Sequence, residues 1–371
     1  MSLHTRTPLI DRLPDFPWDS LAEAKAKAAA HPGGIVNLSV GTPVDPVAPG
    51  IQIALSRAAA FPGYPQTVGT PELREAICAS LGRRYNMTAL DSGSVLPVVG
   101  TKEAIALLPT LLGIGEGLSV VIPEVAYPTY EVAVEAAGAR VLRSDSLLKL
   151  GPEIPALMFI NSPSNPTGKV LGVEHLRKVV GWARENGVIL AADECYLGLG
   201  WDDANAPVSI LDPRVCGDDH TGLLAIHSLS KTSNMASYRA GYLAGDPALI
   251  AELTGVRKHF GLMVPYPIQA AMVAALEDDE QEAGQKLIYA HRRVKLMKAL
   301  LGAGFRIDDS EAGLYLWVTR GQACRDTVDW FAERGILVAP GDFYGPRGVD
   351  HVRVALTETD ERIDAAVARL G

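Results

Sequence analysis

Short runs of apolar residues without polar alternation recur between residues 36 and 244. Segments of helical spacing separate them, for example residues 173–185. Strands that are apolar on both faces and alternate with helices are typical of a mostly parallel sheet with helices on both sides. The pattern therefore predicts an α/β fold with strands at residues 95–99, 119–122, 157–160, 188–192, 223–226 and 242–244.

The pattern changes after Met263. A long charged helix is predicted at 281–301, followed by strands and helices at 313–319, 326–334, 336–339, 351–356 and 360–370. This mixture predicts a smaller α+β domain. We expect residues 1–47 to form an N-terminal arm and part of the small domain, residues 48–276 the large domain, and residues 277–371 the small C-terminal domain.

The first residues, to about 19, read as an irregular arm, because two prolines interrupt the segment that contains Phe16 and Trp18. These aromatic side chains need a cover. A partner subunit and the chain's own domain are equally good candidates at this point.

Polar groups follow the predicted strands at their carboxyl ends. Ligands of open α/β sheets bind at this edge, so these side chains are candidates for one site. They are Thr101, Tyr127, Asn165, Asp193 and Lys231.

Lys231 lies just past the buried run 223–226, where burial can lower its pKa and allow a Schiff base with a carbonyl. Ser228, Ser230 and Arg239 offer hydroxyl donors and a guanidinium fork that suit a phosphate. Together they suggest pyridoxal 5′-phosphate (PLP). A Ser-x-Ser-Lys turn taken alone is more often a solvated loop, so the assignment depends on other stretches.

Each of those stretches has a simpler structural reading beside the functional one. Gly100-Thr101-Lys102 opens a helix whose first N–H groups could bind a phosphate, but Thr101 could simply cap the helix. Tyr127 could stack on a ring or pack in the core. Asn165 could bind a ligand oxygen or its own backbone.

Two charged residues belong to apolar strands. Asp193 ends an apolar strand, where an unpaired charge is costly, and a pyridinium nitrogen would pair it. Arg353 lies between valines in an alternating strand. On this pattern alone, an arginine that faces solvent is favoured over one whose guanidinium binds a substrate carboxylate.

Composition narrows the function classes. The 371 residues carry a net charge of −9, with an isoelectric point near 5.4, which argues against nucleic-acid binding. The four cysteines form no metal-binding or disulfide pattern, so we expect no metal and a reducing cytoplasmic setting. No stretch is apolar enough to predict a membrane helix.

The motifs in order resemble those of the class I/II aminotransferases, which are fold type I PLP enzymes. The resemblance covers Gly41 to Arg353 and rests on residues 161–168 (NSPSNPTG), 193–196 (DECY), 228–231 (SLSK) with Arg239, and 351–353 (HVR). It implies small-molecule amino-acid and keto-acid substrates and a homodimer.

The resemblance also implies roles. Lys231 forms the Schiff base and moves a proton, Asp193 pairs with the pyridinium nitrogen, and Asn165 and Tyr196 bind the ring oxygen. Tyr127 stacks on the ring, while Arg353, with the Gly41 backbone, binds the substrate carboxylate. The phosphate is held by Gly100, Thr101, Lys102 (through its backbone), Ser228, Ser230 and Arg239, with Tyr64 reaching the neighbouring subunit's cofactor.

A narrower resemblance is to actinobacterial N-succinyldiaminopimelate aminotransferases of lysine and diaminopimelate biosynthesis (EC 2.6.1.17). Residues 12–18, 38–46, 231–239 and 261–265 carry it. It implies transfer of an amino group from glutamate to N-succinyl-2-amino-6-oxopimelate. Three alternatives stay open: another aminotransferase acting on aspartate or aromatic amino acids, a PLP carbon–sulfur lyase, and a transaminase-like sensor domain without enzyme activity.

Overall fold

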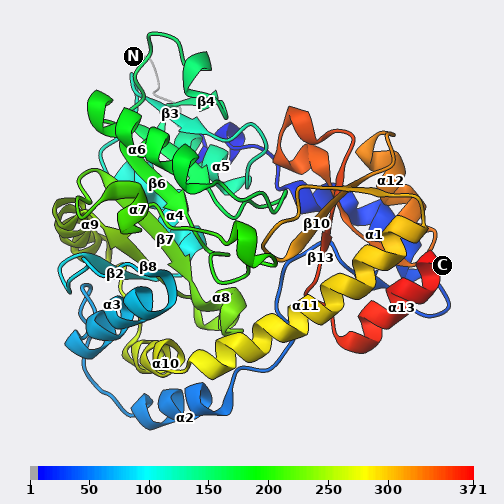
Figure 1. Ribbon diagram of the computed structural model, residues 1–371, viewed down its shortest axis with the longest axis horizontal. Coiled ribbons are helices and arrows are strands. Elements are labelled where there is room, and N and C mark those ends of the chain that lie inside the picture. Colours follow the sequence, from blue (N-terminus) through cyan, green and yellow to red (C-terminus); the bar gives the residue numbers. More distant parts are fainter. Residues whose placement is uncertain (1–6) are drawn as a thin grey trace, which may run out of the picture.

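The computed structural model describes residues 7–371 and shows a large and a small lobe (Figure 1). The large lobe contains a seven-stranded sheet in which β8 alone runs against the others, because it pairs antiparallel with both β2 and β7. The predicted mostly parallel sheet is confirmed. In spatial order its strands are β2 (Val95–Val99), β8 (Ala240–Gly245), β7 (Leu223–Ser228), β6 (Ile189–Asp193), β5 (Leu157–Asn161), β3 (Ser119–Ile122) and β4 (Arg140–Arg143).

Both faces of this sheet are buried, which explains why its strands lack polar alternation. In β5, Met158 and Ile160 belong to one hydrophobic core and Leu157 and Phe159 to the other. One core is covered by α2 (Pro49–Ala58), α3 (Pro71–Tyr85), α6 (Val173–Asn186), α7 (Pro213–Cys216) and α10 (Tyr266–Glu277). The other is covered by α4 (Thr101–Leu111), α5 (Thr129–Ala137) and α9 (Pro247–Phe260).

The small lobe has its own core around an antiparallel sheet of four strands in the order β12-β13-β10-β9. A second, two-stranded sheet pairs β1 (Val36–Asn37) with β11 (Ile336–Leu337). Val36 and Leu38 share this core with C-terminal residues, and the division of the chain at residue 47 stays a prediction. The remaining elements are α1 (Ala22–Ala29), α12 (Cys324–Ala332), α13 (Asp360–Leu370), β9 (Arg306–Asp308), β10 (Tyr315–Thr319), β12 (Ala339–Pro340) and β13 (Val352–Ala355).

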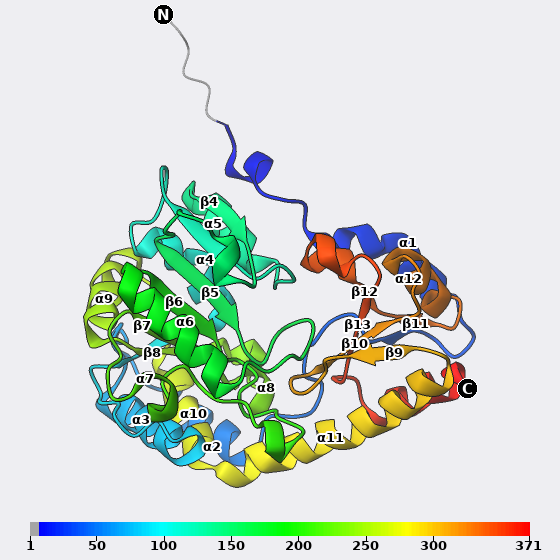
Figure 2. The ribbon, with the colours of Figure 1, turned by 45° about the horizontal axis from the view of Figure 1, so that its top comes forward.

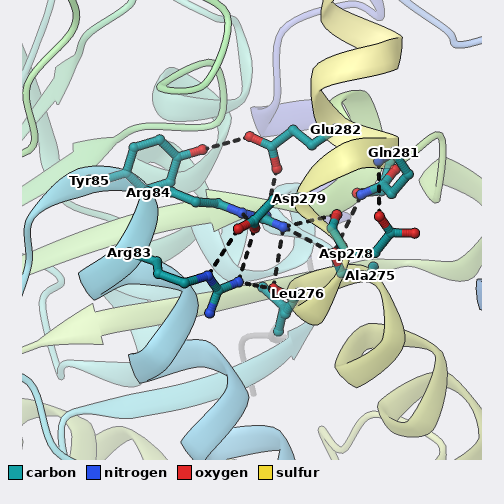
Figure 3. A network of polar contacts seen from close by, with 10 residues as sticks. Arg83, Arg84, Tyr85, Ala275, Leu276, Asp278, Asp279, Gln281 and Glu282 are labelled. Carbon is teal, nitrogen blue, oxygen red and sulfur yellow. Dashed lines mark hydrogen bonds and ion pairs between the residues drawn. The ribbon is translucent and has the colours of Figure 1, made fainter.

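Helix α11 (Asp279–Gly302) runs from the large lobe to the small one (Figure 2). Its first turn is held to α3 by ion pairs: Arg84 Nε lies 2.6 Å from Asp279 Oδ1, and Arg84 Nη1 lies 2.6 Å from Glu282 Oε2 (Figure 3). Further along, the buried Arg292 pairs with Asp45 at 2.6 Å. These contacts hold the first turn of the helix to α3 and its middle to the segment before α2.

Several predicted elements have different bounds in the structure. The strand predicted at 336–339 is two short strands in different sheets, because the chain passes from the sheet of β1 to that of β13. The arm contains two 3₁₀ helices, Leu9–Arg12 and Pro17–Leu21, since proline is tolerated at the start of a helix. Residues 1–6 of that predicted arm lie outside the described residues.

Trp18 packs on Phe343 of the chain's own small lobe, with ring centroids 5.3 Å apart. Phe16 is 55% exposed and lies 5.7 Å from the Lys102 ammonium. The chain itself therefore covers one of the two aromatic side chains of the arm.

Within residues 7–371, no helix combines the length and the apolar character needed to cross a bilayer.

Candidate active site

Lys231 lies where a buried strand turns directly into a helix. β7 ends at Ser228, and α8 (Leu229–Thr232) begins at the next residue. The Ser228 hydroxyl accepts a hydrogen bond from the Ser230 backbone N–H at 3.1 Å and so caps this helix. The Lys231 ammonium donates to the Gly41 carbonyl.

Burial lowers the pKa of the Lys231 amine, and the nearby Arg353 and Arg239 lower it further, against an opposing effect of Tyr315. A lysine with a lowered pKa has more of the neutral amine that attacks a carbonyl. This buried setting is the one expected from the apolar run, and the Schiff-base role of Lys231 stays a prediction.

Asp193 ends β6 and is buried, with 5% of its surface exposed. Its Oδ2 accepts a hydrogen bond from the Tyr130 hydroxyl at 2.7 Å, and its Oδ1 accepts one from the Cys195 backbone N–H at 3.1 Å. Burial raises the pKa of this carboxyl, and these two hydrogen bonds oppose the rise. A cationic partner would stabilise its charge.

The turn after β5 is fixed by Asn161. Its side-chain amide donates to the Asp193 carbonyl at 2.8 Å, and its Oδ1 accepts from the Asn165 backbone N–H at 2.7 Å. The sequence left open whether the Asn165 side chain bonds the local backbone. In the structure, Asn161 makes those hydrogen bonds. The Asn165 side chain instead accepts a hydrogen bond from Arg353 Nη1 at 2.8 Å.

Arg353 is 2% exposed, so the solvent-facing interpretation of this arginine is wrong. The reason is tertiary: β13 is an interior strand, between β12 and β10. Nη2 donates to the Ser39 carbonyl at 2.7 Å, whereas the buried Nε has no partner among the described residues. An uncompensated buried N–H on a guanidinium suits an incoming carboxylate.

Gly100 and Arg239 lie against each other at the start of α4. Gly100 has φ +77°, and a Cβ there would lie 2.3 Å from Arg239 Nη2, so only glycine allows this approach. Thr101 is the first residue of α4, whose N–H groups point toward this place. Lys102 is exposed with its side chain over Phe16, which leaves its backbone N–H as the group directed here.

Two tyrosines of the site were not found from the sequence. Tyr130 bonds Asp193, and the Tyr315 hydroxyl lies 3.2 Å from that of Tyr196. Tyr127 packs edge-on against Tyr130, with centroids 5.8 Å apart. In the sequence, each is a tyrosine within an apolar segment. Such tyrosines are equally common in hydrophobic cores that have no functional role.

Tyr64 does not join this group within the chain. It lies in the turn before α3 and is 97% exposed. Its sequence-based assignment concerns a neighbouring subunit and stays a prediction.

The chain matches the family model described as aminotransferase class I and II over residues 34–370. It is 65% identical to the probable aminotransferase Rv1178 of Mycobacterium tuberculosis, over 96% of this chain and 85% of that protein. It is 56% identical to the 4-dedimethylamino-4-oxo-anhydrotetracycline transaminase OxyQ of Streptomyces rimosus, over 96% and 99%.

More distant relatives share the whole length. The chain is 29% identical to the LL-diaminopimelate aminotransferase of Dehalococcoides mccartyi, over 97% of each protein. The solved structure of an aminotransferase from Neisseria meningitidis superposes with a TM-score of 0.89 at 28% identity, covering 98% of this chain and 97% of that one.

The residues present fit PLP, on which this family depends. A lysine of lowered pKa suits the cofactor's aldehyde, and the buried Asp193 suits its ring nitrogen. The Arg239 guanidinium, which lies against Gly100 at a helix N-terminus, suits its phosphate. The fold, the match over nearly the whole chain and this set of groups agree: the chain belongs to the class I and II aminotransferases and is a PLP-dependent enzyme.

Proposed function

We propose that this chain is an N-succinyldiaminopimelate aminotransferase, which moves an amino group from glutamate to N-succinyl-2-amino-6-oxopimelate. The amino-acid half of the proposal rests on one arrangement. Arg353 holds the Ser39 carbonyl at 2.7 Å, and Lys231 donates to the Gly41 carbonyl two residues away. A carboxylate on Arg353 would therefore place its α-carbon close to the lysine amine.

The acceptor half of the proposal is supported by sequence similarity. Residues 12–18, 38–46 and 231–239 resemble the N-succinyldiaminopimelate enzymes, and the LL-diaminopimelate aminotransferase is a relative that acts on a related dicarboxylic compound. Both observations favour an acceptor with a long carboxylated chain.

We assign the residues as follows. When bound, PLP supplies an electron sink for the negative charge that develops at the substrate α-carbon. Lys231 binds the cofactor and moves the proton at the α-carbon, Asp193 holds the charge of the ring nitrogen, and Arg353 orients the carboxylate. Asn165 keeps Arg353 in place through its 2.8 Å hydrogen bond.

We also propose a homodimer with shared sites. Its support is the resemblance to the class I and II aminotransferases, in which a tyrosine like Tyr64 reaches the neighbouring subunit's cofactor. Tyr64 is 97% exposed and is therefore accessible to a partner. In this arrangement Tyr64 contributes to the phosphate site of the other subunit, next to its Arg239.

OxyQ favours a second candidate, because it is 56% identical and acts on a bulky ketone, as its name states. In that case the donor half of the reaction is the same and the acceptor is a polycyclic ketone. The two candidates differ only in what accepts the amine.

An absorbance spectrum before and after adding glutamate tests the donor half. Loss of the visible band is expected, and an unchanged band would contradict glutamate as donor. The converted enzyme is then offered N-succinyl-2-amino-6-oxopimelate, a polycyclic ketone or pyruvate in separate runs. Recovery of the band with the succinylated keto acid alone supports the proposal, and recovery with the ketone alone supports the OxyQ-like function.

A further inference from the structure

Tyr315 is a buried tyrosine without an assigned role, although it contacts several groups of the site. It begins β10 and is 4% exposed. Its hydroxyl lies 3.2 Å from the Tyr196 hydroxyl, and its ring centroid lies 3.9 Å from the guanidinium carbon of Arg353. One side chain thus bridges the groups assigned to the cofactor and to the carboxylate.

The two hydroxyls lie within hydrogen-bond distance, and either could donate because each phenol has one hydrogen. Burial raises the pKa of Tyr196. Burial also acts to raise the pKa of Tyr315, but the nearby cations Arg353 and Lys231 oppose it, and the pKa of Tyr315 is lowered. These opposite directions favour the arrangement in which Tyr315 donates, which would leave the Tyr196 hydrogen available for a second acceptor.

The ring of Tyr315 supports Arg353 from one face. Asn165 and Ser39 hold the edges of the guanidinium, at 2.8 Å and 2.7 Å. An aromatic ring stabilises a guanidinium that lies over its face. The ring therefore fixes the plane in which the free Nε points.

Gly41 shows how closely Tyr315 approaches this centre. A Cβ on Gly41 would lie 2.0 Å from the Tyr315 hydroxyl oxygen, so any other residue would displace the phenol. The Gly41 carbonyl accepts the hydrogen bond from Lys231. The Tyr315 hydroxyl consequently lies beside the peptide that positions the lysine amine.

We propose that Tyr315 is a positioning residue for both halves of the site: its hydroxyl orients the Tyr196 hydroxyl, and its ring supports the Arg353 guanidinium. The proposal rests on the cofactor and carboxylate roles assigned above to Tyr196 and Arg353. The titratable or charged groups that face Tyr315 are Lys231, Arg353, Tyr196, Cys195, Tyr344, Tyr127 and Tyr289.

The first test separates the hydroxyl from the ring. The visible absorbance of the resting, PLP-loaded enzyme is titrated with pH, without turnover, for Tyr196→Phe, Tyr315→Phe and the double variant. Tyr315→Phe should move the midpoint in the same direction as Tyr196→Phe but less far. The double variant should match Tyr196→Phe, because Tyr315 acts through Tyr196.

The second test removes the ring. Tyr315→Phe should leave the KM for glutamate within about twofold of the wild type, whereas Tyr315→Leu should raise it by about tenfold. Circular dichroism and the thermal midpoint of each apo variant check that the chain still folds.

An unmoved midpoint in Tyr315→Phe, an additive double variant, or equal KM changes in the phenylalanine and leucine variants would overturn the proposal. If Tyr196→Phe itself leaves the midpoint unchanged, the assignment of Tyr196 fails and the proposal falls with it. These results distinguish failure of the Tyr315 role from failure of the assigned site.

Discussion

The Tyr130 hydroxyl donates a 2.7 Å hydrogen bond to Asp193 Oδ2, and neither side chain is open to water. Tyr130 is the second residue of α5, whereas Asp193 ends β6. The helix thus supplies a proton donor to the carboxylate that the site needs in its charged form. This hydrogen bond opposes the rise in the pKa of Asp193 that burial causes, so Tyr130 favours the ionised carboxylate.

Tyr130→Phe should therefore weaken PLP binding. Loss of one hydrogen bond to a charged group corresponds to an increase in the Kd for PLP of about tenfold. The Kd can be measured by titrating the apo enzyme with PLP and following its fluorescence. Tyr344→Phe is a matched control, because it removes a buried hydroxyl that has no partner among the described residues. Equal binding by the two variants would contradict the role of Tyr130.

Arg353→Lys should raise the KM for the donor and for the acceptor alike. The guanidinium of Arg353 bonds Asn165 and Ser39 and, among the described residues, still has its Nε–H free for a carboxylate. A lysine ammonium cannot replace this arrangement. We expect an increase of at least about tenfold in each KM, measured by steady-state kinetics. Arg334→Lys, at an arginine stacked on Trp330, is the control. An unchanged KM in Arg353→Lys would remove this residue from the site.

Gly100→Ala should weaken the affinity for PLP, because the added methyl group would lie 2.3 Å from Arg239 Nη2. Gly113→Ala is a close control: φ there is +67°, and a Cβ would meet no atom within 4 Å. Both variants have the backbone strain of a positive φ, about 1 kcal/mol each. The thermal midpoint of the apo enzyme should fall similarly in both, and only Gly100→Ala should require more PLP for saturation. Equal PLP affinities would rule out the contact between Gly100 and Arg239 as part of the phosphate site.

Glu194 and His227 form a buried pair behind the site, with Oε2 and Nε2 3.4 Å apart. Burial raises the pKa of Glu194 to about 8 and lowers that of His227 to about 3. The native pair is therefore neutral at neutral pH. The carboxyl of the unfolded chain has its ordinary pKa of 4.5. The stability that a protonated Glu194 contributes is therefore complete below that pH and is lost as pH rises toward 8.

Glu194→Gln should remove this dependence on pH. The amide keeps an oxygen for the Ile210 N–H, which Glu194 accepts at 2.8 Å, and carries no ionisable proton. The free energy of unfolding of the wild type, relative to the variant, should fall between pH 5 and 8 by up to about 1.4 kcal/mol per unit. Urea unfolding of the apo enzymes measures this, with the exposed Glu252→Gln as control. Parallel stability curves for the wild type and Glu194→Gln would refute it.

Much of the large lobe was predictable from local pattern. Apolar runs such as 157–160 are fully buried strands because both faces of the sheet are covered, and this burial leaves a direct trace in the sequence. Parallel strands bring their carboxyl ends to one edge, so Asn165, Asp193 and Lys231 could be placed near one another before any coordinates.

The environment of Arg353 was not predictable in this way. Alternating residues fit an edge strand as well as an interior one, and the register of β13 with β10, which sets Arg353 opposite Trp317, depends on distant segments. Tyr196 and Tyr315 are likewise 119 residues apart in sequence. The sequence by itself determined the sheet, the motif residues and the kind of chemistry, because periodicity and strand ends are local properties. The tertiary structure decided which side chains face Arg353, Asp193 and Tyr196, because those contacts join segments whose pairing no local pattern encodes.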